Sequence, residues 1–252
     1  MDLQLEGKVA LVAGGSRGIG QAIALGLAAE GCNLALAARD EARLKEVAAE
    51  VEAKGVRALP VAGDLTEVAA CERFVTRAKE VFGRLDILVT SVHVSLRGQE
   101  EEDRVPALEA LFVLPARLSG LVVPHMKEQG GGVILHLSSI YGRESGGNAA
   151  YNAAKAALIS HTKAMSTALA ADNIRVLTVA PGSVSAPGGT WWRRQQEDPE
   201  GMARFVRENI PMGRFGTAEE VANVAVFLCS PRASWVTGTS VVVDGGQSRS
   251  NI

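Results

Sequence analysis

Short apolar runs alternate along the chain with longer segments in which apolar residues recur every three or four positions. The first apolar run, Gly7 to Gly15, ends in glycines, which is typical of a strand buried on both faces. From Ile19 to Glu30 the apolar residues follow helical spacing, and Gly31 provides the stop. This pattern predicts a buried strand, a glycine-rich turn and a helix.

The same unit of strand, turn and helix repeats along the chain. Further strands are predicted at Asn33 to Ala38, Val56 to Val61, Leu85 to Val89, Val133 to Leu137, Ile174 to Ala180 and Ser240 to Val243. Helices are predicted near residues 41–54, 67–82, 103–129, 150–171 and 217–229. Strands that alternate with helices form parallel sheets through right-handed crossovers. We therefore expect an α/β fold, a Rossmann-type doubly wound parallel sheet of about seven strands in a single domain over residues 1–252.

Two stretches depart from this rhythm. Residues 182–210 combine glycines, prolines, Trp191, Trp192 and a charged run, so we expect an irregular insertion that closes over a substrate. Two adjacent indoles cannot both face inward, so either one caps the pocket or both only anchor the loop. The predicted helix at 103–129 contains three prolines, and an interior proline costs roughly 3 kcal/mol, so at least one kink or break is expected there.

Composition and charge narrow the class of protein. The 252 residues are 47% apolar and 21% charged, enough to bury a full core, and the net charge of −2 comes without a long basic block. Nucleic acid is therefore not an expected partner. The N-terminus is acidic, and the apolar run after it is too short for a signal-peptide core or a membrane span. These observations predict a cytoplasmic protein that acts on a small molecule and has no membrane association.

The cysteines and histidines do not indicate a metal site. Cys32, Cys71 and Cys229 lie far apart in the sequence and fit a reducing compartment as packed thiols. The histidines have no companions at the spacing of metal ligands, and they are His93, His125, His136 and His161. No metal is therefore expected.

A glycine motif marks the turn after the first strand. Gly14, Gly18 and Gly20 stand between a predicted strand and a predicted helix, where glycines let the backbone approach a pyrophosphate and the helix N-terminus offers free N–H groups. An ordinary tight turn is the alternative, but the surrounding parallel-sheet pattern favours dinucleotide binding. The expected cofactor contacts in this turn are Gly14, Ser16, Arg17, Gly18, Ile19 and Gly20.

The end of the second strand indicates which dinucleotide binds. An NAD site usually has a carboxylate there for the ribose 2'-hydroxyl, whereas this chain has Ala38 followed by Arg39. Arg39 and Arg17 are both able to hold a 2'-phosphate, so NADP(H) is the preferred cofactor and NAD(H) the second choice, unless Arg39 is only a solvated residue before a helix. Asp64 and Leu65, after the third strand, are expected beside the adenine, although Asp64 also suits a helix N-cap.

Candidate catalytic groups come from a helix and from the end of a strand. Tyr151 and Lys155 lie one turn apart on the same face of a predicted helix. A nearby ammonium and a positively charged nicotinamide would lower the pKa of the phenol from its usual value near 10, so that Tyr151 can exchange a proton. Ser139 follows a predicted strand at the edge where parallel sheets bind ligands, and its hydroxyl could hold a carbonyl oxygen. A surface pair is the alternative for Tyr151 and Lys155, but the glycine turn and Ser139 favour a catalytic group.

Several short segments carry a resemblance to a known enzyme family. They are Gly14-Gly15-Ser16-Arg17-Gly18-Ile19-Gly20, Ser138-Ser139-Ile140-Tyr141-Gly142, Tyr151-Asn152-Ala153-Ala154-Lys155, Pro181-Gly182, Pro211-Met212-Gly213-Arg214-Phe215-Gly216 and Val236-Thr237-Gly238. Over nearly its whole length the chain resembles the short-chain dehydrogenase/reductase family, most closely 3-oxoacyl carrier-protein reductases and related ketone reductases. The resemblance implies a homo-oligomer, a tetramer or a dimer.

The resemblance also implies roles for individual residues. Tyr151 would donate the proton, Ser139 would orient the carbonyl, and Lys155 would contact Tyr151 and the nicotinamide ribose. The segment that would meet the nicotinamide comprises Pro181, Gly182 and Val184. The candidates on the substrate side are His93, Tyr141, Trp191 and Trp192.

The chain departs from the family pattern at positions that affect activity. Thr90-Ser91-Val92-His93 replaces the usual Asn-Asn-Ala-Gly, Leu111 takes the place of the active-site Asn, and Ala186 that of a Thr. The amides that stiffen the central sheet are then missing, and so is a link in the proton relay, because the leucine side chain cannot bind water. Two hypotheses follow: NADPH-dependent, reversible reduction of a ketone to a secondary alcohol, or, as the alternative, an NADP(H)-binding sensor or low-activity subunit.

Overall fold

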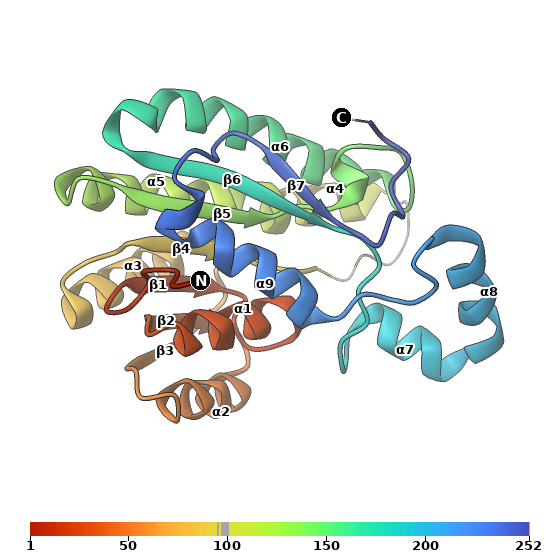
Figure 1. Cartoon of the computed structure of the whole chain (residues 1–252), viewed down its shortest axis with the longest axis horizontal. Coiled ribbons are helices and arrows are strands. Elements are labelled where there is room, and N and C mark those ends of the chain that lie inside the picture. Colours follow the sequence, from red (N-terminus) through yellow and green to blue (C-terminus); the bar gives the residue numbers. More distant parts are fainter. Residues whose placement is uncertain (95, 97–100, 252) are drawn as a thin grey trace.

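A seven-stranded parallel sheet forms the centre of the molecule (Figure 1). The computed structural model describes residues 1–94, 96 and 101–251. Within these residues the strands lie in the order β3-β2-β1-β4-β5-β6-β7, which confirms the predicted doubly wound fold. The strands are β1 (Val9–Ala13), β2 (Asn33–Ala38), β3 (Ala58–Ala62), β4 (Ile87–Thr90), β5 (Gly132–Leu137), β6 (Ile174–Pro181) and β7 (Ser240–Val243).

Helices cover both faces of the sheet. One face packs against α1 (Gly18–Ala29), α2 (Glu41–Glu52) and α9 (Ala218–Cys229), and the other against α3 (Val68–Phe82), α5 (Leu114–Glu128) and α6 (Ala149–Leu169). Successive residues of β1 point into different cores, since Val12 belongs to the cluster under α1 and Leu11 to the cluster under α3. The inner strands β1 and β4 are therefore buried on both sides, as their uninterrupted apolar runs predicted, whereas the edge strands β3 and β7 are only partly buried. Short 3-10 turns are η1 (Glu101–Asp103), η3 (Ile140–Gly142), η4 (Ala170–Asp172) and η5 (Pro231–Ala233).

The stretch with three prolines is broken, as expected. It begins as α4 (Arg104–Leu108), widens into a π-helical turn at η2 (Glu109–Val113), and continues as α5. Residues 104–128 together are long and apolar enough to cross a membrane, but Leu114 and Leu118 are buried against the sheet. The length and hydropathy of this stretch are thus accounted for by the core of the fold.

The region from 182 to 210 is more regular than expected. It contains α7 (Thr190–Glu197) and α8 (Pro199–Asn209), so the prediction of an irregular segment was wrong for its second half. Asp198 accepts a hydrogen bond from the Gly201 N–H at 2.9 Å, and Pro199 occupies the first helical position, where its missing N–H costs nothing. Pro199 thus marks the start of a helix.

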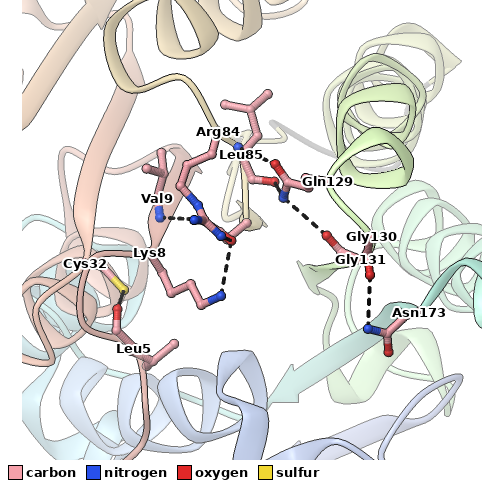
Figure 2. A network of polar contacts seen from close by, with 11 residues as sticks. Leu5, Lys8, Val9, Cys32, Arg84, Leu85, Gln129, Gly130, Gly131 and Asn173 are labelled. Carbon is pink, nitrogen blue, oxygen red and sulfur yellow. Dashed lines mark hydrogen bonds and ion pairs between the residues drawn. The ribbon is translucent and has the colours of Figure 1, made fainter.

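A buried carboxylate ties together the edge of the sheet opposite the carboxyl ends (Figure 2). Asp86, just before β4, accepts hydrogen bonds from the Val9 N–H at 2.9 Å and from two guanidinium nitrogens of Arg84 at 2.7 and 2.6 Å. Nearby, the Gln129 amide bonds both the N–H and the carbonyl of Leu85. These contacts join the starts of β1 and β4 to the end of α5.

We predict that Asp86→Ala lowers the free energy of unfolding by about 2–3 kcal/mol, because charge-assisted hydrogen bonds are lost and the Val9 N–H is left without its acceptor. Urea unfolding followed by circular dichroism measures this loss. The control is Glu80→Ala, which breaks an exposed pair with Arg77 and should change stability by less than about 0.5 kcal/mol. Similar effects in both variants would contradict the role given to Asp86.

Candidate active site

A cavity of about 1060 Å³ opens at the carboxyl ends of the strands. It lies where the chain order of the strands reverses, since β1 has β2 on one side and β4 on the other. Open parallel sheets bind ligands at such a point, because the loops after neighbouring strands part there. The glycine turn after β1 and the three predicted catalytic side chains line this one cavity.

The glycine turn fits a phosphate group. Gly14 has a φ of +83°, and a Cβ on Gly20 would collide with the carbonyl oxygen of Gly14, so both positions need glycine for the turn to close against α1. The N-cap residue of α1, Arg17, makes no side-chain capping hydrogen bond. The first N–H groups of α1 therefore remain available for an anion. The predicted residues of this turn that line the cavity are Gly14, Ser16, Arg17, Gly18 and Ile19, whereas Gly20 packs behind them.

The adenosine end of the cavity contains two arginines. Arg39 lines it, as does Arg17, whose guanidinium donates a hydrogen bond to the Asp40 carboxylate at 2.7 Å. The chain thus has a carboxylate, that of Asp40, one residue after Arg39. Its second oxygen accepts the Arg43 N–H at the start of α2. Both Asp40 oxygens thus have protein partners, and these hydrogen bonds hold the pKa of Asp40 below its usual value.

Asp64 and Leu65 both line the cavity. Asp64 bonds the N–H and hydroxyl of Thr66 at 3.0 and 2.8 Å, which lowers the pKa of the carboxyl. The N-cap of α3 is Glu67, so the alternative role of Asp64 as that cap was wrong. Its carboxylate instead shapes the turn that follows β3.

Ser139, Tyr151 and Lys155 converge at the end of β5. Asn148 caps α6 by accepting the Tyr151 N–H at 3.1 Å, which fixes where the helix starts. The buried Lys155 ammonium donates a hydrogen bond to the Leu137 carbonyl at 2.6 Å and lies 5.7 Å from the centre of the Tyr151 ring. Ser139 lies near enough to the Tyr151 phenol to lower the pKa of that phenol. The structure therefore brings all three groups to one wall of the cavity.

Burial shifts both titratable groups toward their neutral forms. Burial raises the pKa of Tyr151 above its usual 10 and outweighs the hydrogen bond from Ser139, which lowers it. The expected lowering of this pKa is therefore wrong for the protein alone, because the sequence does not show how deeply the phenol is buried. Burial also lowers the pKa of Lys155 to about 8.

Leu111 forms part of an apolar wall beside α6. It is buried in a small cluster with Ala107 and Ala154, against which Tyr151 and Val94 pack. The π-helical turn η2 carries Leu111. The side chain thus takes up space next to Tyr151 without offering a hydrogen bond.

A buried histidine bonds the first of the replaced amide positions. The Thr90 hydroxyl lies 2.7 Å from His136 Nδ1, and the Ser119 hydroxyl lies 3.3 Å from Nε2. Ser119 donates its own proton to the Pro115 carbonyl at 2.8 Å, so Nε2 donates to Ser119 and Nδ1 accepts from Thr90. Burial lowers the pKa of His136 to about 3, so the ring is neutral. This network links β4, β5 and α5, so the central sheet has a polar link although the amides of the family pattern are missing.

The substrate-side candidates separate into two groups. His93 and Trp191 line the main cavity, together with Pro181, Gly182 and Val184. Trp191 also stacks on Phe205 with ring centres 4.7 Å apart, so it anchors its segment while facing the cavity. Trp192 is 38% exposed and does not line either cavity described in this structure. Tyr141 lines a second cavity of about 540 Å³ on the other side of the loop after β5.

A carboxylate that holds the C-terminal segment was not predicted from the sequence. Glu144 accepts hydrogen bonds from the Ser248 hydroxyl at 3.0 Å and from the N–H groups of Arg249 and Ser250 at 2.8 and 2.9 Å. These partners are more than 100 residues away in the chain, and no local pattern signals such a contact. The loop after Ser139 is thereby attached to the end of the described chain.

Comparison with known proteins now identifies the family. A family model described as Enoyl-(Acyl carrier protein) reductase matches residues 13–248. Oxidoreductase UcpA of Salmonella typhimurium is 34% identical over 253 residues, covering 97% of this chain and 96% of that protein. The chain belongs to the short-chain dehydrogenase/reductase family. Another short-chain relative, the 3-oxoacyl-[acyl-carrier-protein] reductase FabG of Thermotoga maritima, is 33% identical and is covered to 99%, against 97% of this chain.

Solved structures of short-chain dehydrogenases superpose closely on this chain. L-Sorbose reductase from Gluconobacter frateurii, complexed with NADPH and L-sorbose, has a TM-score of 0.91 at 36% identity and covers 99% of this chain and 100% of its own. A 7α-hydroxysteroid dehydrogenase complexed with NADH has the same TM-score of 0.91 at 29% identity, with 99% and 97% covered. The protein is thus an NAD(P)-dependent short-chain oxidoreductase.

The buried ammonium gives a testable effect on stability. The pKa of Lys155 is about 8 when folded against 10.5 when unfolded, so the unfolded chain binds more protons between these values and stability rises with pH across that window. Below pH 8 the charge costs at most about 3 kcal/mol. We predict that Lys155→Met raises the free energy of unfolding at pH 7 by roughly 1–2 kcal/mol, since losing the partner of the Leu137 carbonyl offsets part of the gain.

Urea unfolding of wild type and variant at pH 7 and at about pH 9.5 measures this effect, and the advantage of the variant should shrink at the higher pH. Lys163→Met, an exposed position on the same helix, serves as the control and should give no such gain. A variant that is less stable than wild type at both pH values would contradict the argument.

Proposed function

We propose that the protein reduces a ketone to a secondary alcohol with NADPH, reversibly, and that Tyr151 is the proton donor. The observation that carries the proposal is the convergence of Ser139, Tyr151 and Lys155 on the cavity that also contains the glycine turn. NADPH supplies the hydride that the carbonyl carbon receives. The protein supplies the position of the substrate and the proton that the carbonyl oxygen receives, so that C=O becomes CH–OH.

Each of the three side chains has a separate task in this proposal. The Ser139 hydroxyl holds the substrate oxygen, beside the Tyr151 phenol on the same wall of the cavity. Tyr151 gives its proton to that oxygen, and a raised pKa keeps the phenol protonated at neutral pH, ready to donate. Lys155, fixed by the Leu137 carbonyl, has two further N–H donors for the ribose hydroxyls and for the phenol.

The cofactor is held along the whole cavity in this proposal. The uncapped N-terminus of α1 receives the pyrophosphate, and Arg39 receives the 2'-phosphate, which favours NADP(H) over NAD(H). Pro181, Gly182 and Val184 would hold the nicotinamide. Asp64 and Leu65, which also line the cavity, would hold the adenine.

Other features of the proposal concern the setting of the enzyme. The segment 182–210 acts as the lid over the substrate, with Trp191 on the cavity side. The three cysteines are free and buried, in keeping with a reducing compartment such as the cytoplasm. We also retain a homo-oligomer, tetramer or dimer, as the expected assembly. In the alternative function the protein is an NADP(H)-binding sensor. Because Leu111 replaces the active-site Asn of the family, this sensor binds the cofactor but does not turn over a substrate.

Tyr151→Phe tests the proton donor. The ring and its packing remain while the proton is lost, so we predict a fall in turnover of about 100-fold or more with NADPH affinity nearly unchanged. Turnover is followed by NADPH absorbance with a panel of ketones, and affinity by NADPH fluorescence. Tyr141→Phe, at the only other tyrosine, is the control and should change turnover far less. Near-normal turnover in Tyr151→Phe would refute the assignment, and NADPH binding without turnover in wild type would favour the sensor.

Arg39→Gln tests the cofactor preference. Removing one charge-assisted contact to a 2'-phosphate, worth about 1.5–3 kcal/mol, should weaken NADPH binding by one to two decades and leave NADH binding nearly unchanged. Arg43→Gln, whose guanidinium pairs with Glu46 at 2.6 Å outside the cavity, is the matched control. Equal wild-type affinity for the two cofactors would show that Arg39 does not read the phosphate.

A further inference from the structure

Two basic side chains line the substrate end of the cavity, and no carboxylate of the described residues pairs with either of them. His93 follows β4 and Arg193 lies in α7. Within the described ranges 1–94, 96 and 101–251, neither side chain forms a hydrogen bond or an ion pair. An arginine that lines a cavity in this state has five N–H donors free for a ligand.

These two side chains line the same cavity as Lys155. Burial lowers the pKa of His93, and the positive charges of Lys155 and Arg193 lower it further. The charges of Arg193 in α7 and Lys155 in α6 therefore both act on the His93 ring. At neutral pH His93 is uncharged and donates one ring N–H, while Arg193 supplies the charge.

The acidic residues of the cavity do not neutralise this end. Asp40 pairs with Arg17 at 2.7 Å, Asp64 bonds Thr66, and Glu109 pairs with Arg117 at 3.0 Å. Each of these carboxylates therefore already has a partner away from His93 and Arg193. Among the residues that the structure describes, the substrate end of the cavity therefore has unpaired positive charge, which favours an anion there.

We propose that the substrate ketone carries an oxyanion, a carboxylate or a phosphate monoester, which Arg193 and His93 bind while Tyr151 and Ser139 hold the carbonyl. This inference rests on the proposed reduction and adds the class of ketone. The guanidinium forks onto two oxygens of the anion, and the His93 N–H holds the same group from the opposite element. Because Arg193 is in α7 and His93 follows β4, the anion also joins the segment 182–210 to the sheet.

The test compares each anionic ketone with a neutral counterpart. The pairs are acetoacetate with ethyl acetoacetate, levulinate with ethyl levulinate, and dihydroxyacetone phosphate with dihydroxyacetone. The wild-type enzyme is expected to favour the anionic member of at least one pair by about 10-fold or more in kcat/KM, the effect of a single charge-assisted contact. The pair that shows the preference distinguishes a carboxylate from a phosphate.

Variants then assign the preference to residues. Arg193→Gln should lower kcat/KM for the preferred anionic ketone about 10-fold and leave its neutral counterpart within about twofold, and His93→Gln should act in the same direction. Arg194→Gln is the matched control, because this neighbouring guanidinium lies over the Trp191 ring at 5.2 Å and does not line the cavity. NADPH affinity, measured by fluorescence, should stay within about twofold of wild type in all three variants.

Three results would overturn the inference. Wild-type reduction of neutral ketones without preference for any anionic partner would remove it and leave the proposed function standing. Weaker NADPH binding in Arg193→Gln, with equal losses for anionic and neutral ketones, would make Arg193 a cofactor residue. If NADPH binds and no ketone of the panel is reduced, the proposed reduction fails and this inference fails with it.

Discussion

The candidate site depends on one hydrogen bond, from the buried ammonium of Lys155 to the carbonyl of Leu137. A cation in the interior must be bonded closely, because an unpaired buried charge is costly. Meeting that need pins α6 against the end of β5, and the Ser138 hydroxyl adds a bond to the Lys155 carbonyl at 3.2 Å. A Cβ on Gly142 would lie 2.9 Å from that carbonyl, so only glycine lets η3 pass here. Tyr151, one turn earlier on α6, is thereby held over the end of the same strand.

At the centre of the sheet, a buried neutral ring has hydrogen-bond partners for both of its nitrogens. A neutral histidine, His136, sits fully buried in β5 and uses both ring nitrogens, one toward Thr90 and one toward Ser119. Both nitrogens have partners, so burial of the ring leaves no unsatisfied polar atom there. The replacement of amides by Thr90 is therefore compensated by a residue 46 positions away. A polar link can move to other residues while the fold stays the same.

Much of the fold followed from the sequence, because buried parallel strands and amphipathic helices have distinct periodicities. Asn33–Ala38 and Ser240–Val243 match the predicted strands to the residue. That Tyr151 and Lys155 lie together also followed from the sequence, since they share a helix, and both line the main cavity with Ser139. What could not be predicted rests on depth and on distant pairing: burial raises the pKa of Tyr151, and Glu144 holds a segment over 100 residues away. The spacing of residues along the chain shows neither how deeply a side chain is buried nor which distant residue it contacts.

The helices α7 and α8 have a hydrophobic cluster of their own, in which Trp191, Phe205 and Phe215 stack beside the buried Val206 and Ile210. This cluster is separate from the two cores that hold the sheet. Substitutions in α7 and α8 therefore change the stability of this local cluster more than the stability of the whole domain. Because Trp191 belongs to this cluster and also lines the main cavity, substitutions in α7 and α8 can reshape that wall of the cavity while the sheet and α6 stay intact.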